Sequence, residues 1–403
     1  MRGSNRRSSR TCQILFLTQD FPPDRGGIAR LYGELNSRFP SGRVCVSTVA
    51  SRIGEKIDPA ATTQVPIVRM PFTFREARRA ENIFRWARWS AHHVRSQHVT
   101  LLHVGNLHPA GYIALWLNLR LGIPYLLFVH GLDLYKERRK CRQSKIKRLG
   151  SRLLFARAAA VVANSGHTAA TMRGLLEELE IKNPPPTIVV HPGADPDRFR
   201  PSMKRVGEGG PGQDPDEGPL LLSVARLVPR KGIDTALEAV ARLAPSFPGL
   251  IYVIAGSGPD GERLERMAAI LGIASRVRFL GDVQEGALPG LYAAADVFVL
   301  LARECPEHDS VEGFGIVYCE AAAAGVPSVA ADSGGVSDAV RDEETGILVP
   351  PNDPEAAARA IRHLIENRAV RRGMGRNGRR LVEEYYNWDR AAREVWDISR
   401  GLI

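Results

Sequence analysis

Short apolar runs alternate with helical patterns along almost the whole chain. In the first half these runs lie at residues 13–18, 44–49, 67–70, 101–104, 125–129, 160–163 and 187–190. The pattern restarts in the second half at residues 220–224, 250–255, 276–280, 296–301, 327–331 and 346–349. Strand-sized apolar runs separated by helices are typical of parallel α/β folds, because a strand buried on both faces is continuously apolar. The pattern therefore predicts two parallel sheets with helices between their strands.

The length of the chain also favours two domains, since 403 residues exceed the size of one typical core. The break falls in residues 201–219, which are rich in Gly, Pro and acidic residues and predict a flexible linker. We therefore expect a Rossmann-like domain at residues 1–200 and a second one at residues 220–384.

The segment from Glu312 to Glu320 carries the strongest chemical signal. Its two carboxylates lie eight positions apart, the first in a glycine-flanked turn and the second in an alanine-rich run that predicts a helix from about Gly315. The start of a helix offers backbone N–H groups and the positive end of the dipole to an anion. Carboxylates accept strong hydrogen bonds from vicinal hydroxyls. The segment can therefore hold a phosphate at its start, a sugar hydroxyl at Glu312 and a ribose at Glu320.

Two cations follow the first strand of the second half. Arg226 and Lys231 lie in the loop before the next helix, where they can neutralise a diphosphate, whereas Arg230 between them is given no role. Fixed cations are the largest expected catalytic contribution when a departing nucleoside diphosphate gains charge. Gly256, in a Gly-Ser-Gly loop after the following strand, is expected to shape the nucleotide pocket.

Two further motifs follow strands of the first half. Gly26 and Gly27 precede a helix, so that backbone can approach a ligand there without a Cβ in the way. His130 and Asp133 form a His-Gly-Leu-Asp run at the end of another strand. A single His is more often structural than functional, so this run gains weight only together with the other motifs.

Together these motifs resemble glycosyltransferase family four, the retaining enzymes with the GT-B fold. The features shared with that family are the Glu-x7-Glu spacing, its Gly-Phe-Gly-Ile centre, the Arg and Lys five residues apart, the Gly-Gly-Ile loop and the His-Gly-x-Asp run. The resemblance spans residues 19 to about 388. It implies two Rossmann-like domains that face each other across a cleft, with the last helix, in residues 385–403, packed back on the first domain.

The resemblance also implies the role of each candidate residue. The catalytic set is His130, Arg226, Lys231 and Glu312. The donor and its nucleotide would be held by Gly26, Gly27, Arg226, Lys231, Gly256, Val283, Glu312, Phe314, Gly315, Ile316 and Glu320. Gly27 and Asp133 would face the acceptor. No residue is an obvious covalent nucleophile, so the expected mechanism is a front-face transfer in which the leaving phosphate takes the acceptor's proton.

The implied activity is that of a metal-independent hexosyltransferase that uses a nucleotide-sugar and no cofactor. The runs at 20–28, 226–232 and 312–318 look most like bacterial mannosyltransferases acting on phosphatidylinositol mannosides. This favours GDP-mannose as donor and a lipid or glycan as acceptor. A transferase of polysaccharide synthesis that uses UDP-glucose or UDP-N-acetylhexosamine stays open. The Asp-Pro-Asp runs at 195–197 and 214–216 lie in a hinge pattern and in the linker, so no metal site is predicted.

Two other classes of function are weighed against this one. A nucleotide-sugar epimerase shares a GT-B-like architecture but needs acid and base carboxylates around the sugar, and the Arg226, Lys231, Glu312 and Glu320 set argues against it. A non-catalytic binding scaffold predicts broken phosphate or Glu positions, whereas these positions are intact.

The charge of the chain is unevenly distributed. Residues 1–200 hold 32 Lys and Arg against 14 Asp and Glu, a net charge of +18, whereas the rest carries −7. One basic stretch, which also contains aromatic residues, lies at 72–95, and a second basic stretch lies at 136–152. Such surfaces suit docking on anionic lipid headgroups, whereas for residues 72–95 a solvated basic face over a packed core stays open as the alternative. No recognised nucleic-acid module is present. We expect a peripheral protein on the inner face of the cytoplasmic membrane.

The remaining composition agrees with a cytoplasmic protein. Five scattered cysteines without Cys-x-x-Cys spacing predict a reducing compartment and no structural zinc. No apolar run approaches the length that spans a membrane. The sequence does not indicate an oligomeric state.

Overall fold

A computed structural model describes residues 12–24, 26–51, 65–72, 79–201, 218–305 and 310–403. The chain divides into two compact units. Unit 1 comprises residues 1–164, 169–190 and 389–403, and unit 2 comprises residues 165–168 and 191–388. The sequence placed the change of domain at residue 200. The predicted linker lies almost entirely outside the described residues, as do the first eleven residues with their four arginines.

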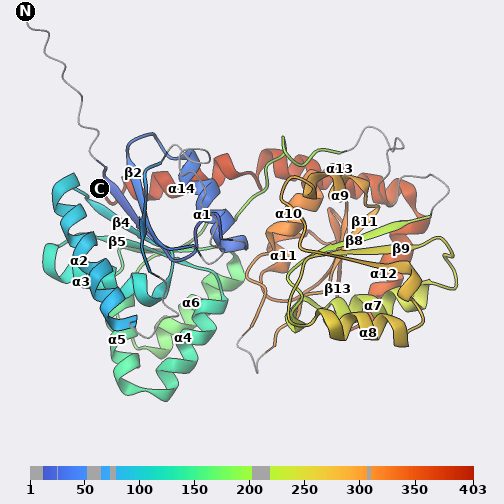
Figure 1. The fold of residues 1–403 in the computed structure, drawn as a ribbon, viewed down its shortest axis with the longest axis horizontal. Coiled ribbons are helices and arrows are strands. Elements are labelled where there is room, and N and C mark those ends of the chain that lie inside the picture. Colours follow the sequence, from blue (N-terminus) through green and yellow to red (C-terminus); the bar gives the residue numbers. More distant parts are fainter. Residues whose placement is uncertain (1–11, 25, 52–64, 73–78, 202–217, 306–309) are drawn as a thin grey trace, which may run out of the picture. The chain divides into compact units, whose positions relative to one another are not determined.

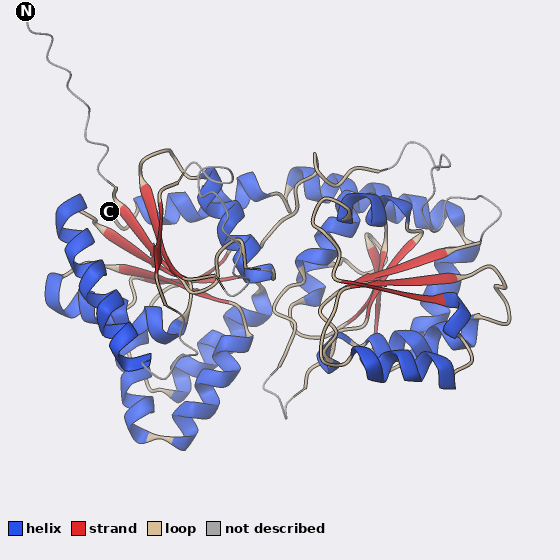
Figure 2. Ribbon diagram, viewed as in Figure 1, coloured by secondary structure: helices blue, strands red, loops and turns tan. Residues whose placement is uncertain are grey.

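Unit 1 is built on one parallel sheet of seven strands in the order β3-β2-β1-β4-β5-β6-β7. The strands are β1 (Ile14–Leu17), β2 (Val44–Val49), β3 (Ile67–Met70), β4 (Leu101–Val104), β5 (Tyr125–Val129), β6 (Ala160–Ala163) and β7 (Thr187–Val189). All but β3 and β7 are buried along their whole length. Complete burial follows from the helices that cover both faces of the sheet (Figure 2).

The helices of unit 1 connect successive strands. They are α1 (Gly27–Arg38), α2 (Arg79–Gln97), η2 (Leu107–Gly111), α3 (Tyr112–Leu121), α4 (Leu132–Gln143), α5 (Lys145–Ala156) and α6 (Gly166–Glu178). Because each crossover returns the chain to the amino edge, the loops that follow the strands gather at the opposite, carboxyl edge. In open α/β sheets this is the edge at which ligands bind.

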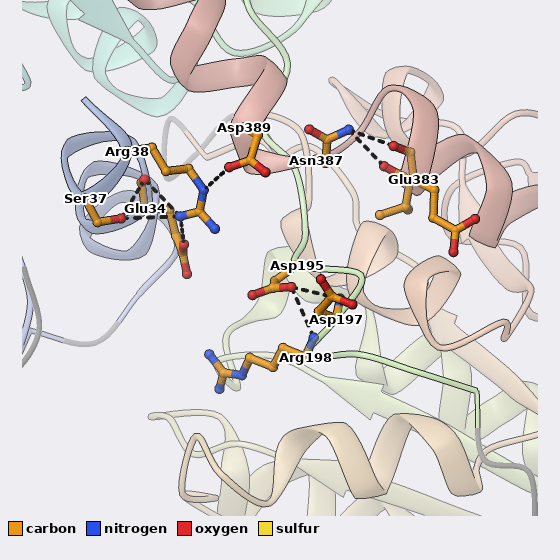
Figure 3. Close-up of polar contacts among 10 residues, drawn as sticks. Glu34, Ser37, Arg38, Asp195, Asp197, Arg198, Glu383, Asn387 and Asp389 are labelled. Atoms are coloured by element: carbon orange, nitrogen blue, oxygen red, sulfur yellow. Dashed lines mark hydrogen bonds and ion pairs between the residues drawn. The ribbon is translucent and has the colours of Figure 1, made fainter. Parts of the chain in front are cut away.

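The last helix, α14 (Trp388–Arg400), packs on unit 1 after the chain has left unit 2. Arg38 of α1 donates from Nε to Oδ1 of Asp389 at 2.8 Å (Figure 3). Deeper in, Nε2 of the buried His103 lies 2.8 Å from Oγ of Ser399. Burial lowers the pKa of His103 to about 3, so its ring is neutral at physiological pH.

Unit 2 contains a parallel sheet of six strands in the order β10-β9-β8-β11-β12-β13. They are β8 (Leu220–Val224), β9 (Ile251–Ala255), β10 (Val277–Gly281), β11 (Val297–Leu300), β12 (Ser328–Ala331) and β13 (Gly346–Val349). The longer helices are α7 (Ile233–Leu243), α8 (Gly261–Ile270), α9 (Leu288–Ala294), α10 (Ile316–Ala323), α12 (Pro354–Glu366) and α13 (Arg368–Glu384). Its described residues also form the short helices η3 (Pro229–Lys231), η4 (Ala274–Arg276) and α11 (Val336–Ala339).

The predicted architecture is confirmed. Every predicted apolar run forms a strand, and no end differs by more than one residue. Each unit is built around one sheet (Figure 1). Both sheets are parallel throughout, and each unit has its own apolar core. All five cysteines are free and buried. Within the described residues, no helix is long and apolar enough to cross a membrane.

Candidate active site

Glu312 lies at the centre of a buried charge cluster in unit 2. Its Oε2 accepts from Nζ of Lys231 at 2.5 Å and from Nη1 of Arg230 at 2.8 Å. Glu312 and Lys231 are only 9% and 8% exposed. Burial by itself would raise the pKa of Glu312, but the charges of Lys231 and Arg230 outweigh burial and hold that pKa below its ordinary value. Glu312 is therefore an anion held by two cations.

The structure divides the predicted cation pair. Lys231 is buried against Glu312, whereas Arg226 is exposed on the loop after β8. Arg230, for which no role was predicted, makes the second contact to Glu312. The short helix η3 explains this arrangement, because its tight turn brings residues 230 and 231 to the same carboxylate. Gly232 completes the turn at φ 63°, where a Cβ would lie 1.8 Å from the carbonyl oxygen of Leu301.

The loop after β12 holds the Glu312 turn in place. The N–H of Gly335 donates to the carbonyl oxygen of Glu312 at 2.9 Å. A Cβ at Gly335 would lie 2.1 Å from the carbonyl oxygen of Gly313, so only glycine permits this approach. The N–H of Gly335 is thus engaged within the protein. The acid of this loop, Asp338, accepts from the N–H of Gly166 and lies 3.4 Å from Nε2 of His191.

The predicted helix start is present. Gly315 is the N-cap of α10 at φ 91°, and Ile316 is its first residue. Phe314 is 2% exposed and belongs to the apolar core of unit 2. Glu320 lies in the following turn, is 1% exposed and accepts from the hydroxyl of Tyr292 at 2.7 Å.

Gly256 supports the loop that carries Arg226. Its φ is 131°, and a Cβ there would lie 1.9 Å from the carbonyl oxygen of Ala225. The N–H of Leu227 donates to the carbonyl oxygen of Ser257 at 2.9 Å, which joins the two loops. Val283 follows β10 and is half-buried.

His130 occupies the carboxyl end of β5 in unit 1, where it is 9% exposed. Its Nε2 lies 2.5 Å from the hydroxyl of Tyr32, and that hydroxyl donates to the carbonyl oxygen of Gly105 at 2.6 Å. A carbonyl can only accept, so the single hydroxyl proton is used there and Nε2 of His130 must carry the hydrogen of the second bond. Burial lowers the pKa of His130 to about 4, which leaves the ring neutral. Tyr32 therefore fixes the tautomer in which Nδ1 has no proton.

Sequence reasoning missed Tyr32, because nothing in its helical surroundings distinguishes it from a core residue. Asp133 was expected and lies in the first turn of α4. Its Oδ1 accepts from the N–H groups of His130 and Leu134 at 3.0 and 3.1 Å, whereas its buried Oδ2 has no hydrogen-bond partner among the residues that the structure describes. Burial raises the pKa of Asp133 to about 6 despite these bonds.

The glycine loop after β1 lies at the same edge of the sheet. Gly26 is the N-cap of α1 at φ 134°, with open space where a Cβ would stand, and Gly27 is the first helical residue. Nearby, Oδ1 of Asn106 accepts from the N–H of Gln19 at 2.7 Å, and its Nδ2 donates to Asp20 at 2.8 Å. These two hydrogen bonds connect the loop after β1 to the loop after β4.

The first Asp-Pro-Asp run forms a local turn (Figure 3). Oδ1 of Asp195 accepts from the N–H groups of Asp197 and Arg198 at 2.9 and 3.1 Å. The second run lies outside the described residues. Among the residues that the structure describes, no group of three or more His, Cys, Asp or Glu is placed to hold a metal ion.

Two Rossmann-like units, a cation-held carboxylate before a helix in the second and a buried His at a strand end in the first define a GT-B glycosyltransferase. The family model "Glycosyltransferase Family 4" matches residues 25–198, and "Glycosyl transferases group 1" matches residues 211–381. The chain is 31% identical to a GDP-mannose-dependent alpha-(1-6)-phosphatidylinositol monomannoside mannosyltransferase of Mycobacterium tuberculosis, covering 96% of this chain and 98% of that protein. The chain belongs to glycosyltransferase family 4 and is a hexosyltransferase.

Other similarities agree with this assignment. A D-inositol 3-phosphate glycosyltransferase of Salinispora tropica is 34% identical over 69% of this chain and 59% of that protein. Among solved structures, a sucrose-phosphate synthase from Thermosynechococcus elongatus superposes with a TM-score of 0.79 at 24% identity, covering 96% of this chain and 98% of that one. The structure of Anabaena HepE in complex with UDP-glucose superposes with a TM-score of 0.75 at 19% identity. The match covers 96% of this chain and 99% of that one. These two structures bear out the GT-B fold.

Proposed function

We propose that this enzyme transfers mannose from GDP-mannose to a lipid or glycan acceptor, with retention of configuration and without a metal ion. The observation that carries the proposal is Glu312 held by Lys231 and Arg230 beside the N-terminus of α10. Cations and helix N–H groups at one place suit a diphosphate, whose negative charge grows as it leaves. The mycobacterial relative is a GDP-mannose-dependent mannosyltransferase, which supports mannose as the sugar and GDP as the nucleotide.

The proposed reaction needs no covalent enzyme intermediate. The bond between the sugar C1 and the phosphate oxygen breaks, the acceptor hydroxyl bonds to C1 on the same face, and its proton passes to the leaving phosphate. Arg226, Lys231 and Arg230 stabilise the diphosphate, Glu312 and the backbone of 314–316 orient the sugar, and Glu320 binds the ribose. His130 faces the reacting sugar, with Asp133 and Gly27 toward the acceptor.

A thermal-shift panel of GDP-, UDP-, ADP- and dTDP-sugars tests the donor, because a ligand that binds the folded state raises apparent stability. GDP-mannose is expected to raise the melting temperature, and Arg226→Ala is expected to abolish the shift. The matched control is Arg266→Ala, an exposed arginine of α8. If only UDP-glucose raises the melting temperature, the donor is UDP-glucose and not GDP-mannose. If no nucleotide-sugar raises it, the proposal is refuted. The anomeric configuration of the product tests retention, and activity in excess EDTA tests metal independence.

We also propose that unit 1 docks on the inner face of the cytoplasmic membrane. Lys136, Arg139 and Lys140 of α4, and Lys145 and Arg152 of α5, are exposed. Basic residues near an anionic surface attract it through long-range electrostatics that salt screens. Co-sedimentation with anionic vesicles is expected to weaken as salt rises, and salt-independent or absent binding would contradict the proposal.

A further inference from the structure

An open groove of about 600 Å³ runs between α2 and α3 of unit 1. Its walls are mostly apolar and include Ile83, Phe84, Ala87, Ala91, Ile113 and Trp116. The volume lies within the usual range of ligand pockets, about 300–1,000 Å³. None of the residues assigned to sugar transfer lines the groove. The proposed reaction therefore does not explain this groove.

Two arginines line one side of the groove. Arg88 and Arg95 lie seven positions apart on α2, with His92 between them, and all three are exposed. Among the described residues that line the groove, none is acidic. An occupant that matches this lining is apolar along its length and carries an anionic group.

The surface around the groove is unusually apolar. Phe84 is 66% exposed and Trp116 is 39% exposed. On α5, which contacts α3, Ile146, Leu149 and Leu153 form one exposed stripe at i, i+3 and i+7. Six of the ten large apolar side chains that are exposed in the described chain lie on α2, α3 and α5.

An apolar surface that spreads over three helices and is flanked by cations suits a bilayer better than a single peptide. α2 and α3 both follow strands of one parallel sheet and lie side by side (Figure 1). The groove follows α2 from Ala80 to Arg95, which is about 22 Å at 1.5 Å per residue. One leaflet of a bilayer has a hydrocarbon depth of about 15 Å, so a single chain fits along the groove.

We propose that the groove between α2 and α3 seats one acyl chain of an anionic membrane phospholipid, with the headgroup phosphate at Arg88 and Arg95. The site is separate from the donor site. It adds to peripheral docking a place where a single lipid molecule is held.

Trp116 is a built-in reporter for the test. The full-length protein is mixed with vesicles of phosphatidylcholine and phosphatidylglycerol that carry bromine on one acyl chain, and tryptophan emission is recorded. We expect the brominated chain to quench the emission that Trp116→Phe removes. Ala87→Phe, which fills the groove, is expected to abolish that quenching. Ala269→Phe adds the same side chain to an exposed position of α8 and is expected to leave quenching unchanged.

A second pair of variants does not depend on filling the groove. Arg88→Glu with Arg95→Glu is expected to remove the preference for phosphatidylglycerol over phosphatidylcholine, whereas Arg266→Glu on α8 is expected to keep it. Vesicle binding without quenching of Trp116, quenching that persists in Ala87→Phe, or no vesicle binding would each overturn the proposal. So would self-association that Ala87→Phe disrupts, because a second copy would then cover the groove. Lipid binding is measured without a nucleotide-sugar. A negative result would therefore count against the lipid site alone, whereas the proposed donor is tested separately by the thermal shift with GDP-mannose.

Discussion

Replacing Lys231 by Met removes one of the two cations that hold Glu312 while keeping a long apolar side chain in the buried site. Breaking a buried ion pair from one side costs about 3–5 kcal/mol, because the remaining charge stays buried. Arg230 still contacts Glu312 at 2.8 Å and is partly exposed, so we expect a smaller loss of about 2–3 kcal/mol. For a domain of this size that loss lowers the melting temperature by about 4–12 °C.

Arg226→Met is the matched control for this prediction. It lies in the same loop but is exposed, so its removal is expected to change stability by no more than about 0.5 kcal/mol. Differential scanning calorimetry of the two variants gives the comparison. Equal melting temperatures for Lys231→Met and Arg226→Met would show that the buried pair does not form.

The same prediction has a pH dependence with a defined sign. The pKa of Glu312 is lowered in the folded protein, so its pairing stabilises the fold above the ordinary Glu pKa of about 4.3. This contribution is lost as the pH falls through the lowered value. The difference between wild type and Lys231→Met is therefore expected to shrink below pH ~4. Adding Glu312→Gln to Lys231→Met should recover part of the loss, because the buried carboxylate charge is removed and the remaining cation, Arg230, is partly exposed.

Three further predictions follow from other buried groups. Tyr32→Phe leaves Nε2 of His130 without its partner, so we expect a loss of about 1–3 kcal/mol in stability and a larger fall in kcat than rise in KM, measured by steady-state transfer assays. Asp133→Asn keeps the acceptor of two N–H groups but removes the charge. Because the folded pKa of about 6 is raised, wild type loses stability as pH rises from about 4 to 6, so the variant should melt higher than wild type at pH 8 but not at pH 4. Ser399→Ala leaves His103 unpaired and is expected to cost about 1–2 kcal/mol, seen as faster proteolysis of α14.

The strands and the donor motif were predictable because their signals are local. A parallel strand covered on both faces is a continuous apolar run, and every such run forms a strand. Gly315 at φ 91° and Gly256 at φ 131° lie where the chain needs a conformation that other residues rarely adopt, so these glycines mark turns in the sequence. The sequence thus determined two parallel α/β sheets and the segments that follow their strands.

Only the tertiary structure decided which side chains meet at those segments. Arg226 was predicted as a site residue and Arg230 was not, but the turn of η3 places Arg230 rather than Arg226 on Glu312, more than eighty residues away. Tyr32 and His130 are 98 positions apart, and the groove needs two helices from different crossovers. Contacts of this kind depend on how the layers pack, because long-range pairing leaves no periodicity in the sequence of either partner.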